Sequence, residues 1–106
     1  MKCLLASPDT SPSLTIGLLV LTLAIPGSRS LKDKRSALLR LFSRIRRAFN
    51  VSVSEVGGRD MRDRAVIAVV SVNNEKVQCN VTLLAIKHEV ETAGELVLSD
   101  FSVQFL

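Results

Sequence analysis

The chain has 106 residues, of which 47% are hydrophobic and 23% are charged, and its formal net charge is +4. This length supports one domain, and so large an apolar share at so small a net charge excludes an intrinsically disordered protein. The two cysteines, Cys3 and Cys79, are too few for a disulfide scaffold in a chain that can build a core. There is no Trp or Tyr and only one His, which leaves few groups for catalysis.

The charges are unevenly distributed along the chain. Residues 29–64 carry eleven basic and four acidic residues, whereas residues 65–106 carry two basic and five acidic residues. Such a dipolar chain favours a polyanionic partner, or its own acidic half in another subunit.

The first elements are an extension and a strand. Residues 1–13 mix Pro, Ser, Thr and Asp without a sustained period, which indicates a poorly ordered N-terminal extension. Residues 14–25 are almost continuously apolar and stop at Pro26 and Gly27, as a buried central strand does. They are too short for a membrane-spanning helix, which needs about 20 residues. A secretory signal peptide is the alternative, but the prolines, the acidic residue and the single lysine before the apolar run disfavour it.

An amphipathic helix is predicted over residues 31–48. Ser30 is its candidate N-cap, and Asp33, three residues later, completes a weak form of the capping box. At about 100° per residue, the apolar residues share one arc: Leu31, Leu38, Leu41, Phe42, Ile45 and Phe49. Five arginines lie on the opposite arc or its flank, and we call them the arginine ridge: Arg40, Arg44 and Arg47, with Arg35 and Arg46 beside them.

The second half of the chain predicts two strands, a helix and a last strand. Residues 51–54 alternate as an exposed strand does, residues 57–63 connect a hairpin, and residues 64–72 are a second continuously apolar strand. A helix over residues 75–92 precedes a strand over residues 95–106. The helix has two apolar stripes, of which we expect the more uniform one to face the sheet: Cys79, Leu83, Ile86 and Val90, rather than Val77, Val81, Leu84 and His88.

The order of elements predicts an α/β protein of the α+β sandwich type. The β-α-β-β-α-β order is that of a ferredoxin-like fold, with a four-stranded antiparallel sheet and two helices on one face, forming a single domain over residues 14–106. The strands at 14–25 and 64–72 become the central pair, and both are apolar in both phases. We therefore expect the second face of the sheet to be covered as well, most simply by another copy of the chain, which makes the protein a homo-oligomer.

Two segments carry a family resemblance. Residues 25–35, IPGSRSLKDKR, and residues 46–56, RRAFNVSVSEV, resemble the YlxP-like family of uncharacterised bacterial proteins, and the similarity extends over residues 14–106. The resemblance implies a small ferredoxin-like domain of the bacterial cytoplasm, whose gene often lies among translation genes. It implies no biochemical activity. Gly58 and Arg62 stand where relatives commonly carry His and Trp, so a role for those aromatic residues is not expected here.

The basic residues are the candidate nucleic-acid site. Guanidinium groups bind phosphates bidentately and displace counterions, so we expect contact with an RNA backbone through Arg35, Arg40, Arg44, Arg46, Arg47, Arg59, Arg62 and Arg64. The alternative is a solvated helix face. Base stacking on the sheet is disfavoured, because no aromatic residue lies on either central strand.

A second candidate site binds a small anion at the start of the first helix. Backbone N–H groups and the helix dipole attract anions there, and the candidate residues are Ser28, Arg29, Ser30, Lys32 and Lys34. The loop lacks the glycines and the Gly-Lys-Ser/Thr ending of a P-loop, so nucleotide hydrolysis is not expected. No catalytic set, metal-ligand spacing or cofactor motif is recognised, and His88 is expected on the surface of its helix.

The favoured hypothesis is a small, non-enzymatic, cytoplasmic protein that contacts RNA or ribosomal particles through its first helix and the hairpin after its second strand. The alternative is a protein-interaction or regulatory homodimer with no nucleic-acid role. A small-ligand or enzyme module that uses the anion loop is the third hypothesis. No membrane association is expected.

Overall fold

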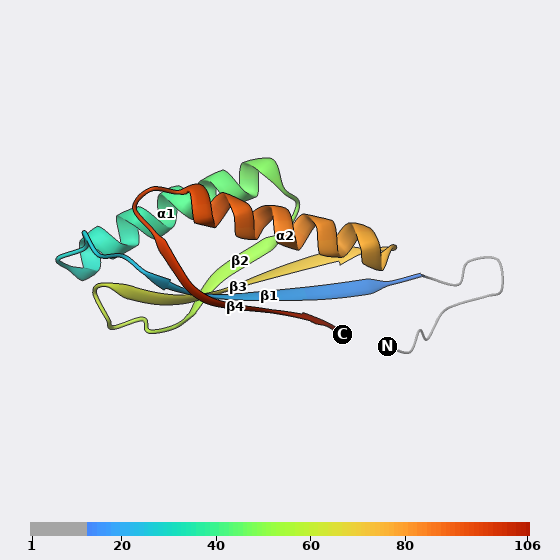
Figure 1. Ribbon diagram of the computed structural model, residues 1–106, viewed down its shortest axis with the longest axis horizontal. Helices are drawn as coiled ribbons and strands as arrows, with labels where there is room; N and C mark the ends of the chain where they lie inside the picture. The colour runs from blue at the N-terminus through green and yellow to red at the C-terminus, as the bar shows by residue number, and fades with distance from the viewer. Residues whose placement is uncertain (1–12) are drawn as a thin grey trace.

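The computed structural model describes residues 13–106 (Figure 1). The predicted extension, residues 1–13, lies outside the described residues except for Ser13, and so does Cys3. The elements are listed in chain order: β1 (Thr15–Ala24), α1 (Leu31–Ala48), β2 (Ser52–Gly57), β3 (Arg64–Asn73), α2 (Lys76–Thr92) and β4 (Val97–Phe105). The predicted β-α-β-β-α-β order is confirmed, and the predicted bounds differ mainly at β2, which is longer, and β4, which is shorter.

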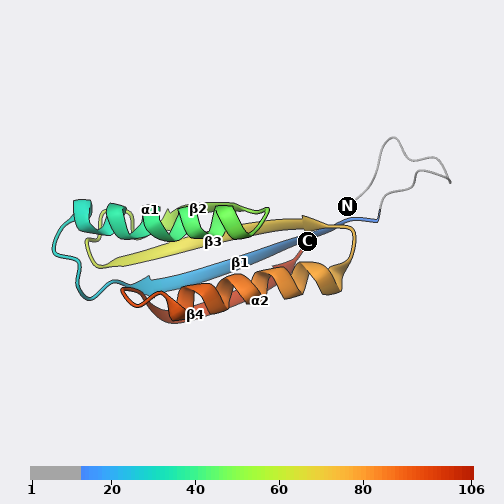
Figure 2. The ribbon, with the colours of Figure 1, turned by 90° about the horizontal axis from the view of Figure 1, so that it is seen from above.

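The four strands form one antiparallel sheet in the order β2-β3-β1-β4. The two long apolar strands, β1 and β3, are therefore the central pair, as predicted. Both helices lie side by side on one face of this sheet, as the two views show (Figures 1 and 2). The fold is thus ferredoxin-like.

The core lies between the sheet and the helices. Alternate residues of β1 (Leu19, Leu21 and Leu23) and of β3 (Ile67 and Val69) are almost completely buried. The first α2 stripe faces them, because its four members are fully buried: Cys79, Leu83, Ile86 and Val90. The second stripe is exposed, so the predicted orientation of α2 is confirmed.

The other face of the sheet is not covered by any element of residues 13–106 (Figure 1). The alternate residues of β1 and β3 that point to this side are mostly aliphatic, and they pair across the strands in register, as Leu18 pairs with Val70. We call this surface the open face. Within the described residues, no helix has the length and apolar character that a membrane span requires.

Candidate nucleic-acid interface

Two members of the arginine ridge are paired with carboxylates of the same chain. The Arg40 guanidinium donates from Nε and Nη2 to the two carboxylate oxygens of Glu95, at 3.1 and 2.8 Å. Arg44 donates to Glu89 at 2.8 Å. The hydrogen bonds from Arg40 lower the pKa of Glu95 and raise the pKa of Arg40. The acidic half of the chain therefore neutralises part of its own basic half.

The other ridge residues have no carboxylate partner among residues 13–106. Arg46 donates to the Val53 carbonyl at 3.2 Å and lies over the Phe42 ring, with its guanidinium carbon 5.5 Å from the ring centroid. Arg47 donates weakly to the carbonyl of Ser43, one turn earlier. Arg35 is exposed in the first turns of α1. The structure thus separates the five predicted arginines into a neutralised pair and three unpaired side chains.

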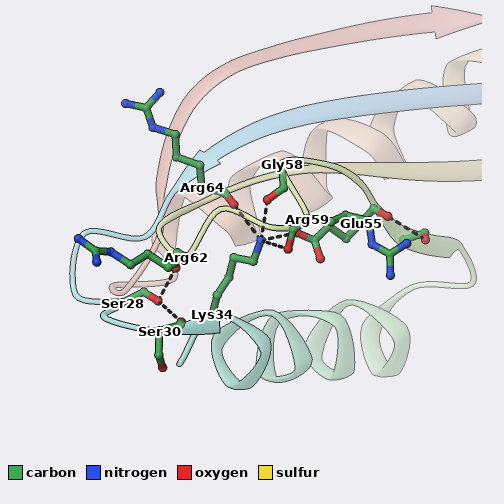
Figure 3. Close-up of polar contacts among 9 residues, drawn as sticks. Ser28, Ser30, Lys34, Glu55, Gly58, Arg59, Arg62 and Arg64 are labelled. Atoms are coloured by element: carbon green, nitrogen blue, oxygen red, sulfur yellow. Dashed lines mark hydrogen bonds and ion pairs between the residues drawn. The ribbon is translucent and has the colours of Figure 1, made fainter. Parts of the chain in front are cut away.

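The connection between β2 and β3 is held by a buried lysine. The Lys34 ammonium donates to the Glu55 carboxylate at 2.8 Å and to the carbonyl of Gly58 at 2.8 Å (Figure 3). It also lies 3.2 Å from the carbonyls of Arg59 and Arg64. An ammonium that is only 1% exposed is tolerated because its three N–H groups have these four acceptors.

A second set of contacts ties this connection to the loop before α1. The Ser28 hydroxyl lies within hydrogen-bond distance of the carbonyls of Ser30 and Arg62 (Figure 3). The Ile25 amide donates to the Asp63 carbonyl at 2.8 Å. The two loops therefore meet at one end of the molecule, where β1 ends and β3 begins (Figure 1).

This end gathers most of the unpaired cations. We call it the basic end and define it by five exposed residues: Arg29, Lys32, Arg35, Arg59 and Arg62. None of the five forms an ion pair with another residue of the range 13–106. Three carboxylates, those of Asp33, Asp60 and Asp63, share this end, so five cations leave a net charge of two positive. Arg64, by contrast, lies on the open face, because it pairs in register with Ala24 and its neighbour Ala65 is buried.

In the predicted anion site, side chains of the protein itself already accept hydrogen bonds from backbone N–H groups. Asp33 caps the first turn with Ser30: the Asp33 amide donates to the Ser30 hydroxyl, and the Arg29 amide donates to the Asp33 carboxylate, both at 3.0 Å. Lys34 faces the protein interior instead of the loop. Of the five predicted residues, only Arg29 and Lys32 present free cationic groups to solvent. Binding of a small anion stays a prediction.

The Lys34–Glu55 pair is the feature that sequence reasoning missed. The sequence indicates only the position of Lys34, which lies three residues after Leu31 and four before Leu38 and therefore beside the apolar arc of α1. Elsewhere, His88 is exposed on α2 and the Cys79 thiol is buried near the Ser71 carbonyl. Among residues 13–106, no group of three His, Cys, Asp or Glu side chains converges as metal ligands would.

The fold and the interface define a small ferredoxin-like α+β protein with a basic end. The chain belongs to the family described as Protein of unknown function (DUF503), whose model matches residues 16–103. A relative is the Uncharacterized protein YlxP of Bacillus subtilis (strain 168), which is 33% identical over 67 residues, or 63% of this chain and 73% of the relative. The resemblance to YlxP-like proteins is thus confirmed.

Matches to this chain among solved structures include the following two. The de novo designed protein Foldit4 matches 87% of this chain and 96% of its own, with 12% identity and a TM-score of 0.53. A C-terminal segment of the alpha subunit of aIF2 from Pyrococcus abyssi matches 90% of this chain and 50% of its own, with 18% identity and a TM-score of 0.45. The first likeness concerns the fold alone, and the second supports no inference.

Proposed function

We propose that this protein binds the phosphate backbone of a structured RNA, free or within a ribosomal particle, through the basic end. The observation that supports this proposal is the gathering of five exposed cations on two adjoining loops and the first turns of α1. Because these cations have no carboxylate partners within residues 13–106, their binding capacity is not already used. We expect no catalytic activity from this surface.

The structure changes which arginines are expected to contact RNA. Arg40 and Arg44 have to leave Glu95 and Glu89 before they can bind a phosphate. The cations of the basic end can bind a phosphate without breaking an ion pair. Because Lys34 fixes the hairpin, less conformational entropy is lost when the hairpin binds. Arg46 and Arg47 extend the positive surface along α1. The primary contact is therefore assigned to Arg59 and Arg62 with the neighbouring cations.

Backbone contact is favoured over base stacking. The aromatic residues of β4, Phe101 and Phe105, lie on the helix side of the sheet, where the ammonium groups of Lys87 and Lys76 cover them. The open faces of β1 and β3 carry no aromatic side chain. A stacking platform of the kind found in RNA-binding sheets is thus absent from these two strands, whereas contact with phosphates requires only positioned cations.

The test is co-sedimentation with ribosomal particles from a bacterial lysate at low salt, with and without RNase. We expect the wild-type protein to sediment with the particles and RNase to release it. The double variant Arg59→Glu with Arg62→Glu should lose this association. The control is Arg40→Glu with Arg44→Glu, which changes the net charge equally but alters the paired arginines, and it should retain most of the binding.

Two results would contradict the proposal. If both double variants lost the association equally, the binding would depend on overall charge and not on the basic end. If the wild-type protein sedimented with a partner in an RNase-resistant way, an acidic protein would be the better candidate. The second result would favour the alternative function, a regulatory homodimer that binds no nucleic acid.

A further inference from the structure

The open face has the composition of a protein interface. Its centre is aliphatic and comprises Ile16, Leu18 and Val20 on β1, with Val66, Ala68, Val70 and Val72 on β3. Its two borders are more polar and include Ser52 and Ser54 on β2, with Ser102 and Gln104 on β4. Exposed valines also lie on these border strands, Val56 on β2 and Val97 on β4. An apolar core with a polar rim is the usual anatomy of a protein–protein contact. Val72 remains 61% exposed, so the face is not covered within the subunit.

We infer that the open face packs against the open face of a second copy of the chain, related by a two-fold axis that runs along the strands. This axis exchanges the two halves of the sheet, because the strand order is β2-β3-β1-β4. The apolar strand β3 then lies over the partner's apolar β1, and the polar border of β2 lies over the partner's polar border on β4. The face is therefore complementary to itself, as an isologous contact requires.

Two charged residues of the open face lie near one end of it. Arg64 on β3 and Asp100 on β4 lie at the same end of the face: Arg64 pairs with Ala24, and Asp100 pairs with Thr22. Figure 3 shows the Arg64 side chain directed away from α1. With the axis along the strands, the partner's Asp100 lies about one strand spacing (about 5 Å) to the side of Arg64 and two residues (about 7 Å) further along the strands, across sheets about 10 Å apart. The partner's Arg64 lies at the same level, also about one strand spacing to the side. A perpendicular axis would instead place Arg64 over the apolar end near Val72.

The area of the open face is sufficient for a stable dimer. Strands of ten residues, as β1 and β3 are, extend for about 33 Å, and four strands span about 19 Å. Because β2 has only six residues and β4 has nine, the face measures about 550 Å² per subunit, and two such faces bury about 1,100 Å², just above the ~1,000 Å² that a specific interface requires. A second copy supplies a surface of matching size and polarity.

The mass of the full chain in solution, measured by sedimentation velocity over a concentration series, tests the inference. We expect a dimer that dissociates on dilution. Ala68→Arg places a charge at the centre of the open face and should raise the dimer dissociation constant by more than about tenfold. Val77→Arg is the matched control, because Val77 is an exposed apolar residue on α2, and it should leave the dimer unchanged. Circular dichroism confirms that each variant is folded.

A second variant covers the case in which Ala68→Arg does not fold. Val72 is exposed in the subunit, so Val72→Arg is compatible with the fold and should also weaken the dimer. A wild-type protein that stays monomeric throughout the series would overturn the inference. So would a dimer that Val77→Arg or Val81→Arg disrupts while the variants of the open face do not, since the contact would then lie on α2.

A charge exchange tests the direction of the axis. Arg64→Asp and Asp100→Arg should each weaken the dimer, because each places like charges near one another across the contact. The double variant should recover most of the wild-type affinity. If the loss of dimer affinity in the double variant equals the sum of the losses in the two single variants, the axis assigned here is wrong. RNA binding by Arg59 and Arg62 does not enter either experiment, so failure of the dimer and failure of the proposed function remain distinguishable.

Discussion

The ammonium of Lys34 lies 2.8 Å from the Glu55 carboxylate, and it is buried while the carboxylate is 17% exposed. This pair joins α1 to β2 at the point where the hairpin toward β3 begins. Buried ion pairs are seldom retained for stability alone, since both charges lose their hydration. Here the same ammonium also binds the carbonyls of the hairpin, so the pair fixes the backbone that carries Arg59 and Arg62.

Replacing Lys34 should strongly destabilise the fold. Lys34→Met leaves the Glu55 carboxylate without its cation and the hairpin carbonyls without their donor, which should lower the free energy of unfolding by about 3 kcal/mol. Urea denaturation measures this change. Lys32→Met is the control, because Lys32 is exposed two residues earlier on α1, and it should cost less than about 0.5 kcal/mol. Equal losses in the two variants would show that the buried pair has no special role.

Gly17 allows α2 to approach β1 closely. A Cβ atom at this position would lie 2.6 Å from the Cys79 sulfur and 2.8 Å from a Leu83 methyl carbon. Gly17→Ala should therefore lower the free energy of unfolding by about 1–3 kcal/mol through overpacking. Gly94→Ala is the control, since a Cβ there meets nothing within 4 Å. A Gly17→Ala variant as stable as this control would indicate that α2 packs less closely than described.

The Arg40–Glu95 pair should be visible in a titration but contribute little to stability. The pKa of Glu95 is lowered mainly by its hydrogen bonds from Arg40, so Arg40→Ala should raise that pKa toward the ordinary carboxyl value. A carboxyl pKa that is lower in the folded state stabilises the fold above the unfolded pKa. This contribution is lost as the pH falls through the folded pKa. NMR titration of the Glu95 side chain measures the change, and an unaltered pKa in the variant would contradict the pairing.

The sequence predicts the fold well because its signals are local and consistent. The N-cap at Ser30 and the apolar arc of α1 both predict the same helix. For α2, the choice between its two apolar stripes follows from the need for the more uniformly apolar one to fill the core. The Pro-Gly stop after residue 25 marks the end of β1. Such agreement between local pattern and topology leaves little freedom in the arrangement.

The candidate site is predicted less well because it depends on contacts between distant residues. The pairing of Arg40 with Glu95 joins residues 55 positions apart, and that of Arg44 with Glu89 joins residues 45 positions apart. No periodicity reveals such partners. A lysine beside an apolar arc also has no sequence signature that separates a buried, fully bonded ammonium from a solvated one. The arginines of a helix can be counted in the sequence, but whether they are free is decided by the tertiary structure.

The salt dependence of RNA binding tests the role of the basic end most directly. The logarithm of the association constant should fall linearly with the logarithm of the salt concentration, with a slope near −4 for about five phosphate contacts. Arg59→Ala with Arg62→Ala should make the slope shallower by about 1.5 to 2, whereas Arg40→Ala with Arg44→Ala should leave it nearly unchanged. A slope that is equal in the wild-type protein and the Arg59/Arg62 variant, or one that changes only in the Arg40/Arg44 variant, would contradict this assignment.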